Sequence, residues 1–277
     1  MVEQYSFLHD VDAGDLIVSL ASVQSLGGGT YCLKRKKPQL YGLLKPLFDA
    51  QEYISEFKMH NGETVTHDFS TFRNGGIPYG VPLGKLHSKW VKAMVDWSKP
   101  WLKVDPNPAT IGKIVINRTG RYQNYYFPWS KIVDALGSKI VFVGLQEEWM
   151  EFCRKYGKVE HLKTRNMLDV ARAIAGSELF IGNQSSPNAV AEGLKHPLIQ
   201  ETCLFVPDCI YPRSDALHCY DGNLSFKFMG EQYSFAATGK KRKLIRSECP
   251  PGGWKVLVDG KVETSYCFVA LCTNVKM

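Results

Sequence analysis

Three carboxylates lie close together near the start of the chain, in the stretch HDVDAGDLIVSL at residues 9–20. Asp10, Asp12 and Asp15 stand between two apolar runs, and acids so close should repel one another and raise the pKa of at least one. A positioned carboxylate can take the proton of an attacking hydroxyl. We therefore predict Asp15 as a catalytic base, with Asp12 and His9 beside it. The alternative is a solvated loop in which Asp15 complements the start of a helix.

The residues around this loop predict a strand, a helix and a second strand. Residues 4–9 and 30–34 are the predicted strands, and the helix between them ends at the glycines of 26–29. This βαβ order predicts a parallel sheet. Ligands of such sheets bind beyond the carboxyl ends of the strands, so the acids are predicted to point into a cleft. Asp10 and Gly14 are expected to contact an acceptor there, because glycine lets a backbone approach a ligand closely.

The rest of the chain alternates between helices and strands on both sides of a proline-rich segment. Residues 98–112 break both periodicities and are the predicted linker. Residues 253–272 predict a β-hairpin with Asp259 and Gly260 in its turn. The other predicted elements are helices over 39–51, 84–97, 128–136, 147–157, 167–177 and 186–195, and strands over 63–70, 112–117, 139–144, 179–183 and 197–201.

Composition indicates a globular protein with an anionic partner. The chain has 277 residues, 44% of them hydrophobic, and a net charge of +7. Most of the excess lies between residues 227 and 277, the last fifth of the chain, which suggests an anionic partner on one surface of the protein. No stretch is long and apolar enough to span a membrane, and no signal peptide is visible, so we expect a cytoplasmic protein. The eight cysteines form no CxxC pair, which favours reduced thiols over a metal site.

The stretch GNQSSPNAVAEGLKHPLIQE at 182–201 resembles the nucleotide-sugar-binding segment of family 9 glycosyltransferases, the group that includes the heptosyltransferases. In that family a strand ends in Gly-Asn-Asp-Ser-Gly-Pro before a helix. Asn183 and Ser185 match this pattern, whereas Gln184 replaces the aspartate and Ala189 stands where histidine is frequent.

Two further stretches extend the resemblance to roughly residues 1–205. The Gly14-Asp15 pair matches the Gly-Asp that precedes the first helix of the family, where the aspartate is the proposed base. Phe127-Pro128 matches a Trp-Pro pair, although Tyr125 replaces the family's lysine. The resemblance implies an α/β GT-B fold, in which two Rossmann-like domains face each other across a cleft. It also implies a donor in the C-terminal domain, an acceptor in the N-terminal domain and no obligatory metal.

We therefore predict an N-terminal acceptor domain over 1–105, a nucleotide-sugar domain over 106–235 and a basic extension with a β-hairpin over 236–277. The resemblance places Asn183 and Gln184 at the donor, for which a UDP-sugar is favoured.

Cationic and helix-terminal groups are expected to hold the diphosphate of such a donor. Arg118 and Arg121 follow a predicted strand, and Ser185 and Ser186 lie where a helix begins. Without a metal, the developing charge of a diphosphate leaving group needs guanidinium groups and backbone N–H groups. The alternatives are two solvated arginines and ordinary helix caps.

Two acids near the same segment could bind the donor's hydroxyls. Glu192 lies in the predicted helix and Glu201 ends the next strand. A carboxylate accepts two hydrogen bonds from a vicinal diol, so either acid suits a ribose or sugar. The alternative for both is an ordinary surface acid.

The acceptor is expected to be anionic. The stretch at 121–129 interleaves arginine with aromatic residues, a pattern used for single strands and flipped bases, although helix packing is the alternative for these aromatics. The run at 239–246 concentrates cations, and an anionic membrane surface or a solvated loop would also explain it. The predicted acceptor ligands in this run are Lys240, Lys241, Arg242 and Lys243.

These observations together predict an inverting glycosyltransferase. Its acceptor is either DNA bearing a hydroxymethyl-pyrimidine, as in a bacteriophage acting in the host cytoplasm, or an envelope glycan. The alternative function is a non-catalytic nucleotide- or nucleic-acid-binding module of the same fold.

Overall fold

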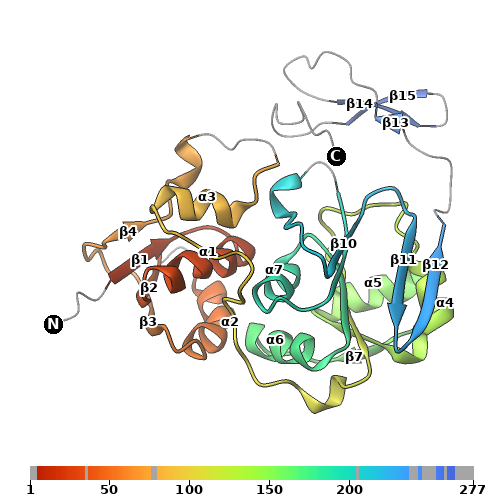
Figure 1. Ribbon diagram of the computed structural model, residues 1–277, viewed down its shortest axis with the longest axis horizontal. Helices are drawn as coiled ribbons and strands as arrows, with labels where there is room; N and C mark the ends of the chain where they lie inside the picture. The colour runs from red at the N-terminus through yellow and green to blue at the C-terminus, as the bar shows by residue number, and fades with distance from the viewer. Residues whose placement is uncertain are drawn as a thin grey trace.

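The computed structural model describes residues 5–34, 37–75, 80–203 and 206–236, together with the backbone of three short strands between 243 and 265. Two parallel sheets lie side by side, with helices packed between and around them (Figure 1). The first sheet is built by the N-terminal part of the chain and the second by the part that follows the proline-rich segment.

The first sheet has four parallel strands in the order β3-β2-β1-β4. β2 and β3 lie on one side of β1 and β4 lies on the other, so the strand order reverses at β1. The residues after the carboxyl end of β1 therefore lie at the edge where such sheets bind ligands. The elements of this half are β1 (Tyr5–His9), α1 (Ala13–Ser25), β2 (Gly29–Leu33), α2 (Pro38–Asp49), β3 (Ile54–Met59), β4 (His67–Asp68), η1 (Phe72–Gly75) and α3 (Leu83–Trp90).

Three details of the first half differ from the sequence prediction. The strand predicted over 63–70 is only the two residues of β4, whereas β3 was not predicted at all. The burial of β3 alternates irregularly, so its sequence ISEFKM lacks the period of two that marks a half-buried strand. The helix predicted over 84–97 ends at Trp90, and Lys92 beyond it has a positive φ of 57°.

The glycines of 26–29 end α1 as predicted and also bring strands together. Gly28 has a φ of +82°, and a Cβ added to it would lie 2.0 Å from the Tyr53 carbonyl oxygen. Gly29 has a φ of +145°, and a Cβ added to it would lie 2.0 Å from the Tyr5 carbonyl oxygen. Any side chain at either position would therefore push β1 or β3 away from β2.

The second sheet has six parallel strands in the order β10-β9-β8-β5-β6-β7. This is the doubly wound arrangement, and its direction reverses between β5 and β8. Two strands, β7 and β10, were not predicted. The elements of this half are η2 (Pro108–Thr110), β5 (Ile114–Asn117), α4 (Trp129–Leu136), η3 (Gly137–Lys139), β6 (Ile140–Val143), α5 (Gln146–Tyr156), β7 (Glu160–Leu162), α6 (Met167–Gly176), β8 (Leu179–Asn183), α7 (Ser186–Gly193), β9 (Leu198–Glu201), η4 (Pro207–Cys209) and β10 (Ala216–Cys219).

The two halves share one core. α1 packs against α7, and α2 packs against α6, so helices of both halves form the layer between the sheets (Figure 1). Every residue of α1 from Asp15 to Val23 is buried, because one side of the helix faces the first sheet and the other faces α7. A helix enclosed in this way is part of a core.

The predicted linker is packed between the halves. Trp101 is 1% exposed, and its backbone N–H and that of Leu102 both donate to the Gly193 carbonyl at the end of α7. The indole N–H of Trp101 donates to the Ile17 carbonyl of α1 at 3.0 Å. Trp101 thus joins the connecting segment to α7 through its backbone and to α1 through its side chain.

Strand pairs follow the second sheet. β11 (Leu224–Phe228) and β12 (Glu231–Phe235) form an antiparallel pair that was not predicted. Two strands of the predicted terminal hairpin are present as the antiparallel pair β14 (Trp254–Val258) and β15 (Lys261–Ser265), while β13 (Lys243–Leu244) pairs with β14. Asp259 and Gly260, expected in the turn, lie outside the described residues. Residues 266–272 of the predicted hairpin lie outside the described part of the chain.

Within the described residues, none of the helices combines the length and the apolar character that a membrane span requires.

The position of Trp101 predicts a large cost of truncation. Trp101→Ala removes a fully buried indole and should lower the free energy of unfolding by about 3–5 kcal/mol. Denaturant unfolding measures this change, and Met94→Ala serves as control because Met94 is 92% exposed. Equal stability of the two variants would show that the connecting segment is not fixed between the halves.

Candidate active site between the two sheets

The N-termini of α1 and α7 meet where the two sheets reverse direction. α1 follows β1, and α7 follows β8. A Cβ added to Gly14 would lie 4.0 Å from the Cα of Ser186, so the first turns of the two helices are in contact. The side chains of the cap residues, Asp12 and Ser185, bond none of the backbone N–H groups of their helices. The N–H groups of the first turns can therefore bind an anion, except at Pro187 of α7, which has no N–H.

Asp15 is the buried acid of this junction. It is 8% exposed, and its carboxylate accepts a hydrogen bond from Arg73 Nη2 at 2.9 Å. Burial raises the pKa of Asp15 from 3.8 to about 6, against the opposing charge of Arg73. The nearby charges of Asp208 and Asp12 add smaller increases to this pKa. Asp15 therefore titrates near neutral pH, mainly because it is buried and only slightly because of the repulsion expected from its neighbours.

Asp12 and Asp10 are neutralised by cations instead. Asp12 lies 2.8 Å from Lys37 Nζ and 3.7 Å from Arg121 Nη1, and the hydrogen bond from Lys37 lowers its pKa. Asp10 lies 3.5 Å from Lys34 Nζ. Each of the three predicted acids thus has its own basic partner, and Asp12 has a second one from the other half of the chain.

His9 lies in the core, which corrects the expectation that it acts directly beside the acids. It is fully buried, and its Nε2 lies 3.1 Å from Nε2 of His87. Its Nδ1 accepts the backbone N–H of Asp10 at 3.2 Å. Burial lowers the pKa of His9, so the ring is neutral at pH 7. Its hydrogen bond with the Asp10 backbone helps to hold the acidic loop.

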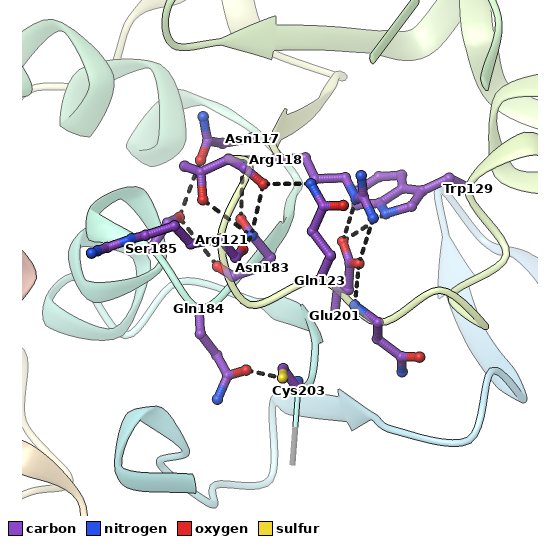
Figure 2. Close-up of polar contacts among 12 residues, drawn as sticks. Asn117, Arg118, Arg121, Gln123, Trp129, Asn183, Gln184, Ser185, Glu201 and Cys203 are labelled. Carbon is purple, nitrogen blue, oxygen red and sulfur yellow. Dashed lines mark hydrogen bonds and ion pairs between the residues drawn. The ribbon is translucent and has the colours of Figure 1, made fainter. Parts of the chain in front are cut away.

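Arg118 and Glu201, predicted as donor ligands, bind each other in the structure (Figure 2). Arg118 Nε and Nη2 lie 2.8 and 3.0 Å from the two carboxylate oxygens, and both side chains are almost fully buried. Glu201 also accepts the Asn124 backbone N–H at 2.7 Å and the Trp129 indole N–H at 2.8 Å. With these partners the pair holds the loop after β5 against the end of β9.

Glu192 is likewise an internal ion-pair partner. It is 1% exposed and contacts Lys195 Nζ and Arg213 Nε, the latter at 2.8 Å. Both of its carboxylate oxygens are thus bonded inside the protein, and its role toward a ribose stays a prediction.

Asn183 and Gln184 hold loops at the junction (Figure 2). Asn183 Oδ1 accepts the Thr119 backbone N–H at 3.1 Å, and its Nδ2 donates to the carbonyls of Thr119 and Arg121. Gln184 Oε1 accepts the Cys203 backbone N–H at 2.7 Å. These amides fix the geometry of the segments after β5 and β9.

The two serines lie at the start of α7. The Ser185 hydroxyl donates to Asn117 Oδ1 at 3.1 Å, so it ties the cap position to the end of β5 (Figure 2). Ser186 is half-buried and is the residue nearest Gly14 of the other half. Of the predicted donor ligands, Ser186 therefore stands at the point where both helices begin.

Arg121 is the predicted arginine that remains open. Its side chain is 65% exposed, and its guanidinium lies over the ring of Tyr122 at 5.1 Å from the ring centroid. Because its only charged contact among the described residues is the 3.7 Å approach to Asp12, it can turn to another anion.

Two residues of the junction were missed. Arg73, in η1, follows β4, the strand that lies on the other side of β1 from β2 and β3. Its position after a strand at this point of the sheet was the signal available in the sequence. Asp208, in η4, has its pKa raised by burial and is close enough to Arg73 and Asp15 for their charges to interact. Its segment follows β9, and no sequence pattern placed it beside the first half.

The structure does not describe the side chains of the predicted basic acceptor ligands. Lys240, Lys241 and Arg242 lie outside the described residues, and only the backbone of Lys243 is described, in β13. Among residues that the structure describes, His, Cys, Asp and Glu form no group of three that could hold a metal ion.

The Arg118–Glu201 pair predicts a stability effect. Glu201→Gln leaves a buried guanidinium without its counter-charge and should lower the free energy of unfolding by about 3 kcal/mol or more. Arg121→Gln is the control, because an exposed substitution usually changes stability by less than about 0.5 kcal/mol. Chemical unfolding of the two variants measures both. Unchanged stability with lost donor affinity in Glu201→Gln would return Glu201 to the set of donor ligands.

Comparison with known proteins identifies the architecture. No family model matches the chain, and a search of curated proteins finds no match. Among solved structures, E. coli heptosyltransferase WaaC with ADP-2-deoxy-2-fluoro heptose has a TM-score of 0.54 at 9% identity, over 78% of this chain and 92% of that one. A family 9 glycosyl transferase from Veillonella parvula DSM 2008 has a TM-score of 0.51 at 13% identity, over 72% and 80%. The predicted resemblance is thus confirmed as one of fold: the chain has the GT-B architecture of two Rossmann-like domains found in family 9 glycosyltransferases.

Proposed function

We propose that the protein is a glycosyltransferase that moves a sugar from a nucleotide sugar to an acceptor hydroxyl. The observation that carries this proposal is the position of Asp15, a buried carboxyl with a pKa of about 6, where the N-termini of α1 and α7 meet. A base that titrates near neutral pH suits proton removal from a hydroxyl, and helix N-termini suit a diphosphate. The shared fold with the two glycosyltransferases agrees with both roles.

In the proposed reaction, the acceptor oxygen attacks the anomeric carbon from the side opposite the leaving group. The bond between that carbon and the diphosphate oxygen breaks, and the nucleoside diphosphate leaves with the electron pair. Asp15 takes the proton of the attacking hydroxyl, and the configuration at the anomeric carbon is inverted. The first-turn N–H groups of α7 and the guanidinium of Arg121 stabilise the charge that develops on the leaving group.

We assign the donor to residues 106–235 and the acceptor to residues 1–105. The support is the distribution of groups at the junction: α7 and Arg121 belong to the second half, whereas Asp15 and its neighbours Asp10 and Gly14 belong to the first. A UDP-sugar is the proposed donor, and an ADP-sugar is the alternative that the bound ligand of WaaC suggests.

For the acceptor we propose a glycan. The structural similarity to a heptosyltransferase supports a saccharide acceptor. The argument for hydroxymethylated DNA depends on the basic run at 239–246. A saccharide acceptor that carries acidic groups also agrees with the net charge of +7.

Replacing the base tests the function. Asp15→Asn keeps the size of the side chain but cannot take a proton, so turnover should fall at least about 100-fold, within the range of general base catalysis. In the wild type, kcat/KM should decline as the pH falls below about 6, because the Asp15 carboxylate becomes protonated. Transfer from UDP- and ADP-sugars is followed by release of the nucleoside diphosphate.

Stability separates loss of the base from loss of the fold. The pKa of Asp15 is higher in the folded protein than its ordinary value of 3.8, so its burial penalty is absent below pH 3.8 and complete above about pH 6. Asparagine removes this penalty, which is on the order of 3 kcal/mol, and the variant should melt at the same or a higher temperature at pH 7. Asp12→Asn is the matched control and should stay active. The base is misassigned if the control loses activity and Asp15→Asn keeps it.

The acceptor class is tested with DNA. We expect transfer to a glycan and none to a duplex that contains hydroxymethyl-cytosine. Should the run at 239–246 bind DNA, affinity would fall steeply between about 50 and 200 mM salt, with a slope of about −0.9 per neutralised phosphate. Replacing Lys240, Lys241, Arg242 and Lys243 with alanine would flatten that slope. Salt-sensitive binding together with transfer to the duplex would overturn the glycan assignment.

A further inference from the structure

Arg73 forms an ion pair with the carboxylate of Asp15, which is the base of the proposed reaction. Its Nη2 lies 2.9 Å from Asp15 Oδ1. A base that is hydrogen-bonded to a guanidinium has one oxygen less for the acceptor hydroxyl, and the positive charge makes it a weaker base. The ion pair is therefore compatible with an enzyme at rest but unfavourable for proton transfer.

The two partners of this ion pair differ in freedom to move. The Asp15 side chain is 11% exposed, whereas that of Arg73 is 42% exposed. The preceding residue, Phe72, is buried, with its ring centroid 4.1 Å from that of His87. The guanidinium lies over the Phe72 ring at 4.9 Å. The backbone of Arg73 is thus anchored by its neighbour while its guanidinium stands at the surface of the junction.

The proposed position of the donor's diphosphate lies next to the pair. Asp15 follows Gly14, and Gly14 contacts Ser186 at the start of α7, where the proposed function places the donor's diphosphate. A long side chain that reaches Asp15 can reach a diphosphate bound there. Charge-assisted hydrogen bonds from arginine to phosphate oxygens are at least as favourable as those to a carboxylate.

On this geometry, and resting on the proposed function, we propose that Arg73 is a donor-responsive positioning residue. It holds Asp15 in an ion pair in the free protein and turns to the diphosphate when the donor binds. Donor binding thereby frees the Asp15 carboxylate for the acceptor, so the base becomes available only after the sugar to be transferred is in place.

Other charged groups also face Asp15, and a test must distinguish their effect on its pKa from the effect of Arg73. Asp12 and Asp208 raise the pKa of Asp15, and Arg73 lowers it. The charge of Asp15 in turn acts on neighbours from other elements. These neighbours are Tyr31 of β2, Tyr122 after β5, Cys209 of η4 and Tyr211 beyond it. The Arg73 charge also acts on His9 and His87, whose pKa values are lowered, mainly by burial, that of His87 to about 3.

The proposal predicts how donor affinity depends on pH. Loss of its counter-ion raises the pKa of Asp15, so donor binding takes up a proton and affinity increases as the pH falls. For each unit by which the pKa rises, affinity should be about tenfold higher at pH 5 than at pH 8. UDP-glucose and ADP-glucose are suitable probes, because their esterified diphosphates do not titrate in this range. Calorimetric titration of the full chain with each probe gives the dissociation constants.

Variants of Arg73 make the test specific. In Arg73→Gln the contact with the diphosphate is lost, and the Asp15 pKa is already high in the free protein. Donor affinity should therefore be close to that of the wild type at pH 8, lower than it at pH 5, and should change less than about threefold between the two. Arg73→Lys keeps a mobile cation and should keep the pH dependence. Asp15→Asn should remove the dependence and thereby assign it to Asp15. Arg121→Gln is the matched comparison: it removes the cation that we propose for the diphosphate, so affinity should fall at every pH, but it leaves the Asp15 pair intact and should keep the pH dependence.

The outcomes distinguish this proposal from the proposed function. If Arg73→Gln shows the same pH dependence as the wild type, Arg73 stays on Asp15 in the complex and the proposal is wrong, while the function stands. If neither nucleotide sugar binds the wild type at any pH, the proposed function fails and the donor-responsive role fails with it.

Discussion

The contact between α1 and α7 is the constraint on which the rest of the molecule depends. It joins the two sheets through helices that are buried on both sides, and it brings the two helix N-termini to one point. A residue such as Asp15, which begins as one of three acids in a loop, becomes buried because α7 covers the helix that carries it. The raised pKa of this acid is thus a property of the interface between the halves and not of the acidic stretch alone.

The ion pairs around this contact have two different roles. Arg118 with Glu201, and Glu192 with Arg213, are buried and tie loops and strands of the second half together. Arg73 with Asp15, and Arg121 with Asp12, have an exposed guanidinium that can exchange its partner. The difference in exposure of the guanidinium separates structural arginines from those that can meet a ligand.

The sequence predicted the architecture well because hydrophobic periodicity determines parallel sheets strongly. The helices and strands from β5 to β9 lie close to their predicted ranges, apart from β7, and the family resemblance led to the correct fold. β3 and β7 were missed because short strands without alternation carry no period. Asp15 was predicted at the junction from its position after a strand.

The ligand assignments were harder because spacing along the chain does not reveal partners. Arg118 and Glu201 are distant in sequence, yet each satisfies the charge of the other after folding. Arg73 and Asp208 come from η1 and η4, one in each half, and only the packing of the halves brings their charges near Asp15. Local patterns predict which residues stand at strand ends, whereas long-range pairing decides which of them remain open.

The hydrogen bonds between the connecting segment and α7 have a consequence for how the chain can be divided. The Gly193 carbonyl near the end of α7 is satisfied by Trp101 and Leu102, which precede the second sheet in the chain. The helix that begins at the junction is therefore completed by residues that a cut at the predicted domain boundary would assign to the other half. Expressed separately, the second half would lack the cap of α7 and the first would expose an indole that is normally enclosed. The two Rossmann-like units thus share hydrogen bonds and a hydrophobic cluster across the predicted boundary, and neither unit contains all the partners of its own helices.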